Sequence, residues 1–357
     1  MKNFYKNKKV LITGHSGFKG SWLTQVLLNF GADVVGVSLP PETSPSLFDI
    51  LEMDKDPRIK NYFTDIRDFE TIMKIFSDEK PEIVFHLAAQ AIVRSSYDDP
   101  LKTISTNVIG TANILQAIKE TETTKSAVII TTDKVYENKE WHHAYRENDA
   151  LGGYDPYSAS KAAADIVTNS YIQSFFNPKD LKDKHDTLVA ITRAGNVIGG
   201  GDWAEYRLIP DIIRSIYVKK EKLESRSPEA VRPWQHVLEP LSGYLMLGQG
   251  LYEGKTDFSG AWNFGPNNES FVSVSRLISE AIKILGEGEY ITKSDTSKHE
   301  ASLLKLDINK ANALLDWQPR FNFKDTLEFT FSWYRNYYEK REDVVEFTNK
   351  QIEEFFK

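Results

Sequence analysis

The chain has 357 residues, of which 41% are hydrophobic and 27% charged, a composition typical of globular proteins large enough for two lobes. Its net charge of −7 argues against a nucleic-acid partner, and the absence of cysteine excludes disulfides, thiolate metal ligands and cysteine nucleophiles. No apolar run approaches the ~18 residues of a membrane span, so we expect no membrane partner, and we expect no metal site.

In the first half of the chain, β-branched runs alternate with helical patterns. The runs at residues 9–12, 33–39, 83–87, 127–131 and 188–192 predict strands, and residues 21–30, 69–78, 101–119 and 156–176 predict helices. This alternation predicts an α/β fold with a doubly wound parallel sheet. The first strand lies so near Met1 that no signal peptide is expected before it, and we therefore expect a cytoplasmic protein.

After Asn196 the composition of the sequence changes. Three glycines occupy residues 199–201, and the later segments are shorter and richer in Trp, Pro and charge. We expect residues 1–195 to form the first domain and residues 196–357 to form a smaller second lobe. Residues 236–255 are apolar at helical spacing and are expected to pack back on the first domain, which makes the second lobe discontinuous.

A glycine turn follows the first expected strand. Gly14, Gly17 and Gly20 stand between that strand and an amphipathic stretch, the context in which glycines let a backbone approach a pyrophosphate at a helix N-terminus. The spacing departs from G-x-G-x-x-G, and glycines that only mark a turn are the alternative. The second expected strand ends in Ser38 without the acidic residue that would hold ribose hydroxyls, which leaves NAD and NADP open.

Polar residues then follow the strand expected at residues 127–131. Thr132, Asp133 and Lys134 stand at its carboxyl end, where open α/β sheets bind ligands. Tyr157 and Lys161 lie four residues apart at the start of a helix and therefore share one face. An adjacent ammonium favours a phenolate, so we expect Tyr157 to have a lowered pKa and to act as a base toward a sugar hydroxyl.

Taken together, these motifs resemble the extended, nucleotide-sugar-modifying branch of the short-chain dehydrogenase/reductase superfamily. Within it, residues 131–138, 152–158, 193–203 and 232–240 are similar to the CDP-glucose 4,6-dehydratases. The resemblance implies a Rossmann-like domain that binds NAD, a substrate lobe that binds CDP-glucose, and, by analogy, a homodimer. It also implies a redox-neutral dehydration and a 6-deoxy or dideoxy surface sugar, such as those of lipopolysaccharide O-antigen, as the usual end of the pathway.

The resemblance also implies roles for single residues. Tyr157, with Lys161 and Thr132, would deprotonate the 4-hydroxyl, and Asp133 would protonate the leaving 6-hydroxyl. Lys134 stands where related enzymes have a carboxylate base. It would be a neutral base, would stabilise the enolate, or would only order the loop in an ion pair with Asp133.

The expected ligand contacts divide between cofactor and substrate. The residues expected at the cofactor are Gly14, His15, Gly17, Phe18, Lys19, Gly20, Asp65, Ile66, Leu87, Ala88, Ala89, Gln90, Asn107, Tyr157, Lys161 and Arg193. Those expected at the substrate are Asn196, Arg207, Leu208, Arg232, His236 and His299. Asp65 has a helix N-cap as its alternative, Arg193 a purely structural role, and Asn107 a bend in its helix.

Three rival functions stay open at this point. A nucleotide-sugar 4-epimerase shares the chemistry at C4 but needs no elimination acid, so Asp133 discriminates against it. A dehydratase for another nucleoside diphosphate hexose is the second rival. A non-catalytic NAD-sensing protein would have little use for Tyr157, Lys161 and Asp133 together.

Overall fold

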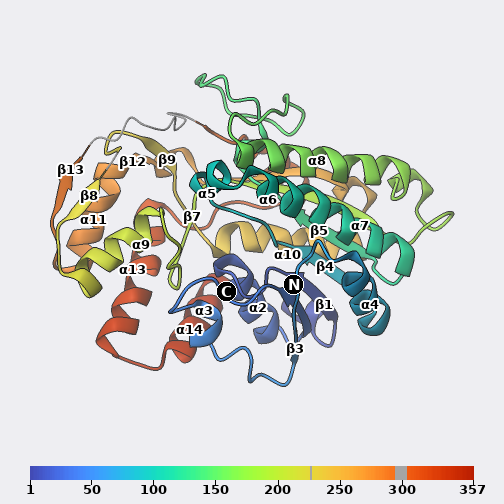
Figure 1. Ribbon diagram of the computed structural model, residues 1–357, viewed down its shortest axis with the longest axis horizontal. Helices are drawn as coiled ribbons and strands as arrows, with labels where there is room; N and C mark the ends of the chain where they lie inside the picture. Colours follow the sequence, from blue (N-terminus) through green and yellow to red (C-terminus); the bar gives the residue numbers. More distant parts are fainter. Residues whose placement is uncertain (226, 294–303) are drawn as a thin grey trace.

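The computed structural model describes residues 1–225, 227–293 and 304–357. Its centre is a parallel sheet in the order β11-β6-β5-β4-β1-β2-β3 (Figure 1). The strands are β1 (Lys9–Thr13), β2 (Asp33–Ser38), β3 (Ile59–Phe63), β4 (Ile83–His86), β5 (Ser126–Ile130), β6 (Leu188–Ala194) and β11 (Gly260–Phe264). The strand order reverses between β1 and β4, and ligands of such sheets bind beside this point. The predicted doubly wound α/β fold is confirmed.

All five predicted strands are present, and the sheet has two more at its edges. β3 is an edge strand with only Ile59 buried, so its sequence lacks the apolar run of a central strand. β11 begins at Gly260 and contains Asn263, which hides it among loop-like residues. It extends the sheet beyond β6, although it lies far along the chain.

Helices cover both faces of the sheet (Figure 1). One face carries α4 (Phe69–Glu79), α7 (Gly110–Thr121) and α8 (Pro156–Ser174), and the other carries α2 (Phe18–Asn29) and α10 (Leu238–Tyr252). Alternate residues of the central strands enter the two apolar cores, as period-two side-chain directions require. α10 packs directly on β4, β5 and β6.

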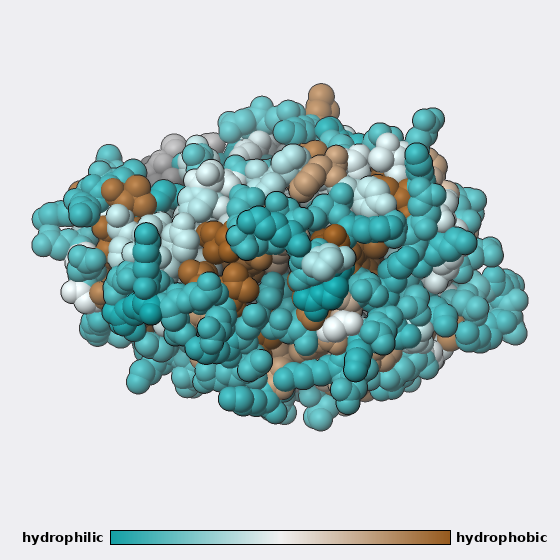
Figure 2. Space-filling model, turned by 90° about the horizontal axis from the view of Figure 1, so that it is seen from below, coloured by the Kyte–Doolittle hydropathy of each residue, from teal (hydrophilic) through white to brown (hydrophobic). Residues whose placement is uncertain are grey.

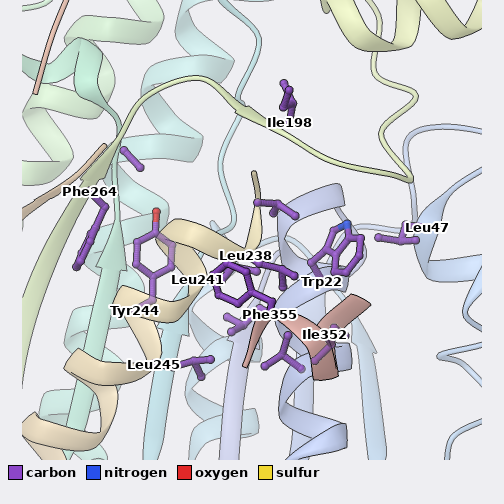
Figure 3. Packing of buried hydrophobic residues seen from close by; sticks show 14 of the residues in the cluster. Trp22, Leu47, Ile198, Leu238, Leu241, Tyr244, Leu245, Phe264, Ile352 and Phe355 are labelled. Atoms are coloured by element: carbon purple, nitrogen blue, oxygen red, sulfur yellow. The ribbon is translucent and has the colours of Figure 1, made fainter. Parts of the chain in front are cut away.

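The core on the α10 side extends to the end of the chain. Figure 3 shows α2, α10 and the C-terminal α14 (Val344–Phe355) contributing, among others, Trp22, Leu241, Tyr244, Ile352 and Phe355. α14 packs against α2. The C-terminal segment therefore braces the helix that follows the glycine turn.

The expected start of the helix at residue 156 is also confirmed. Asp155 caps α8, accepting hydrogen bonds from Ser158 N at 3.0 Å and Ser158 Oγ at 2.6 Å, and Pro156 occupies the first turn. The helix expected at residues 101–119 is instead α6 (Pro100–Ile104), a π-helical turn (Ser105–Ile109) and α7. Such turns are rare and often lie at functional sites.

The remaining segments form the smaller part at the left of Figure 1 and short connections. In it two pairs of short strands form, β9 (Val231–Pro233) with β12 (Phe271–Ser273) and β8 (Leu223–Ser225) with β13 (Tyr290–Thr292), and helix α11 (Val274–Leu285) packs on α13 (Phe323–Glu339). The smaller part also contains α9 (Leu208–Ile213) and a π-helical turn (Arg214–Lys219). The helix α12 (Asn309–Leu315) packs on β11 of the central sheet. The short connections include α1 (Lys2–Tyr5), α3 (Leu47–Ile50), α5 (Val93–Asp98), β7 (Val197–Ile198) and β10 (Gln235–His236).

The surface is mainly hydrophilic. In the view of Figure 2, hydrophobic residues show mostly near the middle of the face, in its recessed part. Among the described helices, none combines the length and the apolar character needed to cross a membrane.

Candidate active site

A cleft of about 1670 Å³ opens at the carboxyl ends of the strands. Its walls are the glycine turn, the segments that follow β2, β4 and β5, the start of α8, and residues 194–211 and 223–234 with their neighbours. Sites for one small ligand usually measure about 300–1000 Å³. The cleft therefore has room for two ligands side by side.

The glycine turn closes tightly at two of its three glycines. Gly14 has a φ of +75°, and a Cβ on it would lie 2.8 Å from the backbone N of Ala88. A Cβ on Gly20 would lie 2.0 Å from the carbonyl oxygen of Gly14, whereas one on Gly17 would meet that oxygen at 3.4 Å. α2 begins at Phe18, inside the motif, so its N-terminal N–H groups lie at the cleft.

We predict that Gly20→Ala lowers the free energy of unfolding by about 1–3 kcal/mol, because its methyl group overlaps a backbone oxygen. Gly17→Ala is the matched control and should change stability by only about 0.5 kcal/mol, since its contact is of ordinary length. Urea unfolding of both variants measures the difference. Equal stability would contradict the steric account.

His15 lies behind the turn instead of in the cleft. Its ring is fully buried and hydrogen-bonds Ser38 Oγ at 3.0 Å and Asn61 Oδ1 at 2.9 Å, above Gly36 of β2. Burial lowers the pKa of His15 to about 4, so the ring is neutral at pH 7. The His15 side chain thus fastens the turn to β2 and β3 and is not a lining residue of the cleft.

Asp65 and Ile66 both line the cleft, in the segment after β3. The Asp65 carboxylate pairs with Arg67, whose Nη2 lies 2.6 Å from Oδ2, and this pairing lowers the pKa of Asp65. The N-cap alternative for Asp65 is wrong, because Asp68 caps α4 by accepting from Thr71 N at 3.1 Å. Asp65 is therefore free of a capping role in α4.

The segment Leu87–Gln90 lines the cleft and is fixed from behind by Asn107. Asn107 lies in the π-helical turn, accepts from Gln90 N at 2.8 Å, and donates to Gln90 O and Ser160 Oγ. It is buried and does not line the cleft. Its side chain joins the segment after β4 to α8.

Asp133 lies in a short 3-10 turn (Asp133–Val135) directly after β5. Its carboxylate is only 2% exposed and accepts a hydrogen bond from Thr132 Oγ1 at 2.9 Å. Lys134 Nζ lies 3.7 Å from Asp133 Oδ1, and the Lys134 side chain is 38% exposed. Of the three alternatives for Lys134, the geometry shows the ion pair, and this exposure gives little of the desolvation that a neutral lysine needs.

Tyr157 and Lys161 share one face of α8, as expected. Lys161 Nζ donates to the carbonyl oxygen of Ile130 at 2.8 Å, and burial lowers its pKa to about 8. Burial raises the pKa of Tyr157 to about 12, opposed by a hydrogen bond with Thr132. The expected lowering of the Tyr157 pKa is wrong for the protein alone, because desolvation of the phenolate outweighs the nearby positive charge.

The expected substrate residues divide into two groups. Asn196, Arg207, Leu208 and Arg232 line the cleft, and Arg207 Nη1 pairs with Asp202 Oδ2 at 3.0 Å. His236 does not line it: the ring is fully buried beside Trp22, Phe321 and Phe329, and burial lowers its pKa to about 3. His299 lies outside the described residues.

Arg193 was expected at the cofactor, with a purely structural role as the alternative, and the structure favours the structural role. Its guanidinium is buried in a bidentate pair with Asp165 and does not line the cleft. The sequence reading also missed Gly195, where a Cβ would lie 2.9 Å from Asp133 Oδ2. The signal for Gly195 was present, since it belongs to the motif at residues 193–203.

Comparison with known proteins gives the family. Residues 11–330 match the GDP-mannose 4,6-dehydratase family. The chain belongs to this family. One relative, CDP-glucose 4,6-dehydratase of Salmonella typhimurium, is 44% identical over 355 residues, 99% of this chain and 98% of its own length. The dTDP-glucose 4,6-dehydratase of Haemophilus influenzae is 28% identical over 91% of this chain and 97% of its own.

Solved structures of the family's fold include enzymes of two kinds. A dTDP-glucose 4,6-dehydratase of Streptomyces venezuelae, solved with NAD bound, has a TM-score of 0.78 at 24% identity, covering 94% of this chain and 99% of its own. UDP-glucose 4-epimerase of Thermotoga maritima has the same TM-score at 22% identity, covering 92% and 99%. The backbone therefore does not distinguish a dehydratase from an epimerase, and the side chains must do so.

Proposed function

We propose that this family member is a CDP-glucose 4,6-dehydratase, which forms CDP-4-keto-6-deoxyglucose and water. One observation carries the choice over an epimerase: the buried carboxylate of Asp133, which accepts from Thr132 Oγ1 at 2.9 Å, lines the same cleft as the phenol of Tyr157. An acid for elimination and a base for C4 thus meet in one cleft. The identity of 44% to a named CDP-glucose 4,6-dehydratase supports the cytidine nucleotide.

The cofactor we propose is NAD. A Cβ at Gly14 or Gly20 would collide with backbone atoms, so only glycine lets this turn close at the cleft, where the N-terminus of α2 suits a pyrophosphate. Glu42, in the loop after β2, is a cleft-lining carboxylate of the kind that holds the ribose hydroxyls of NAD. When bound, NAD supplies a reversible two-electron exchange with the sugar ring.

The chain's own residues divide the proton transfers. Tyr157 takes the proton of the 4-hydroxyl, and Thr132 and Lys161 line the same cleft. The ketone at C4 then acidifies the C5 proton. Asp133 receives a proton from its ion partner Lys134 and gives it to the 6-hydroxyl, which leaves as water. The Lys134 amine takes the C5 proton in exchange, so the pair ends with its original charges.

We also propose that residues 1–195 with 236–255 hold the cofactor and that residues 196–357 otherwise bind the nucleotide sugar. Arg207 and Arg232 are suited to the diphosphate, because a guanidinium matches it with paired donors. Both proposed ligands are cytoplasmic metabolites, so we place the reaction in the cytoplasm. A surface deoxysugar such as that of O-antigen is its proposed destination.

Incubation of the protein and NAD with CDP-glucose tests the proposal. A dehydratase yields a base-sensitive 4-keto-6-deoxy sugar nucleotide, an epimerase yields CDP-galactose, and an NAD-sensing protein yields neither. Parallel reactions with dTDP-, GDP- and UDP-glucose identify the base. Absence of a keto product from every sugar nucleotide would overturn the proposed function.

We further propose a homodimer, formed where α6, the π-helical turn and α8 lie side by side. Leu101 is 78% exposed there, and Ile104, Ile109 and Ile166 are exposed as well. Apolar side chains gathered on neighbouring helices are typical of a protein interface. A second copy of the chain would cover them.

For the double variant Leu101→Glu/Ile166→Glu, we expect sedimentation as a monomer, because two carboxylates would be buried at the interface. Leu314→Glu, at an equally apolar exposed position on α12, is the matched control and should leave the dimer intact. A wild-type protein that sediments as a monomer at micromolar concentration would contradict the proposal.

A further inference from the structure

We propose that Asp165, together with Arg193, is a positioning residue of the active site. Its buried carboxylate maintains the charge of Lys161 and anchors the segment that carries Asp133. The inference deepens the proposed function, because it assigns these two residues to the same proton-transfer site. Neither side chain faces the bound sugar in this assignment, so both act through other residues.

The pair lies behind the cleft, between α8 and β6. Arg193 Nε and Nη2 donate to the two oxygens of Asp165 at 2.8 and 2.9 Å, a bidentate geometry. The two side chains are 3% and 2% exposed. Burying such a pair brings little net stability over apolar residues of the same volume. Its presence therefore indicates that the charges have another use.

One use concerns Lys161, one turn before Asp165 on the same face of α8. Lys161 Nζ donates to Ile130 O at 2.8 Å, and Thr131 Oγ1 lies 3.4 Å from Asp165 Oδ2. The ammonium and the carboxylate therefore contact neighbouring residues at the end of β5. Asp165 is placed to hold a proton on Lys161 while that lysine is buried.

Among the described residues, few charged or titratable groups act on Lys161. Asp165 raises its pKa against the lowering by burial, while Lys19 of α2 is a repelling cation. His86 of β4 also faces it, but burial lowers the pKa of His86 to about 3, so that ring is neutral. Tyr157 lies one turn before it on α8 itself. Removing the Asp165 charge must therefore lower the pKa of Lys161.

The second use concerns the segment of Asp133. Arg193 Nη1 donates to Tyr136 Oη at 2.8 Å, and Tyr136 Oη donates to Asn263 Oδ1 of β11 at 2.7 Å. Tyr136 ends the 3-10 turn that begins at Asp133. Thr131 Oγ1 also donates to Thr192 O at 3.1 Å. The pair thus ties α8, β6 and the Asp133 turn into one unit.

Competitive acetylation across a pH series, followed by peptide mass spectrometry, measures the protonation of Lys161 without any need for turnover. We expect a midpoint near 8 in the wild type and a midpoint lower by about one pH unit or more in Asp165→Asn. At pH 7.5 the Lys161 amine should accordingly react several-fold faster in the variant.

Two further variants test whether a change in the Lys161 midpoint comes from the lost charge or from a disturbed structure. Tyr136→Phe removes a hydrogen bond of Arg193 but no charge, so the wild-type midpoint is expected. Asp165→Asn/Arg193→Gln removes both charges, so no unpaired arginine is left buried, and its midpoint should fall by less than in the single variant. The double variant keeps the test available if Asp165→Asn does not fold.

Turnover provides a second readout. Asp165→Asn should lower kcat about fivefold or more at pH 8, because the charged fraction of Lys161 falls by that factor when its midpoint drops by one pH unit. Activity should recover toward lower pH, with KM for the sugar nucleotide changed less than threefold. A Lys161 midpoint that stays at the wild-type value in Asp165→Asn or the double variant, or that moves equally in Tyr136→Phe, would overturn the inference. A wild type without dehydratase activity would instead overturn the proposed function and leave the acetylation result standing.

Discussion

Tyr157→Phe is expected to lower kcat for CDP-glucose by about 10²- to 10⁴-fold, the usual contribution of a general base. The phenol is the group assigned to the 4-hydroxyl, and the Thr132 hydroxyl, which donates to Asp133, cannot replace it at neutral pH. Cofactor affinity, followed by quenching of protein fluorescence, should change little, because the glycine turn is untouched. Product formation is measured by the absorbance of the keto sugar in base.

The matched control for this prediction lies on the same helix. Tyr171→Phe also removes one phenolic oxygen from α8, but Tyr171 Oη bonds Gln116 Oε1 at 2.9 Å, away from the cleft. Its kcat should equal that of the wild type. Retention of more than about one tenth of wild-type kcat by Tyr157→Phe would remove the phenol from the mechanism.

Local signals in the sequence were sufficient to predict where the cleft lies and which helix carries Tyr157 and Lys161. Strand, glycine turn and helix are consecutive, so the crevice beside β1 follows from short-range pattern and sheet topology. Helix periodicity alone predicts that Tyr157 and Lys161 share one face, and Asp155-Pro156 predicts the start of that helix. Each of these relations spans only a few residues.

Side-chain direction was the part that sequence could not supply. His15 stands among the glycines, yet its ring turns back onto β2 and β3, which is decided by Ser38 and Asn61. His236 belongs to a motif at the cleft, but neighbouring aromatic rings enclose it. The direction of each histidine ring depends on residues distant in the chain, and the hydrophobic periodicity of the sequence does not indicate it.

The sequence was equally unable to predict the protonation state of Tyr157. The pair Tyr157 and Lys161 suggested a phenol with a lowered pKa, but burial has the larger effect and raises it to about 12. The ligand-free protein therefore keeps Tyr157 neutral. Its activation as a base must coincide with ligand binding, which brings charges that the chain alone does not hold at this position.

Asp133→Asn is expected to reduce formation of the keto sugar by about 10²- to 10⁴-fold, because the amide cannot donate an acidic proton to the 6-hydroxyl. The replacement has the same shape, and its ion partner Lys134 is partly exposed, so folding should be little affected. Asp180→Asn, in the surface pair with Lys184 at 3.2 Å, controls for loss of one carboxylate and should keep full activity.

The same variants determine the part played by Lys134. If its amine takes the C5 proton, Lys134→Met stops the uptake of solvent deuterium at C5, while Asp133→Asn loses product but still exchanges that proton. If Lys134 only pairs with Asp133, Lys134→Met retains both exchange and product within about tenfold of the wild type. Nuclear magnetic resonance of the sugar in deuterium oxide distinguishes the two results. Keto sugar formed by Asp133→Asn at the wild-type rate would exclude this carboxyl as the acid, and the dehydratase mechanism built around it would fail.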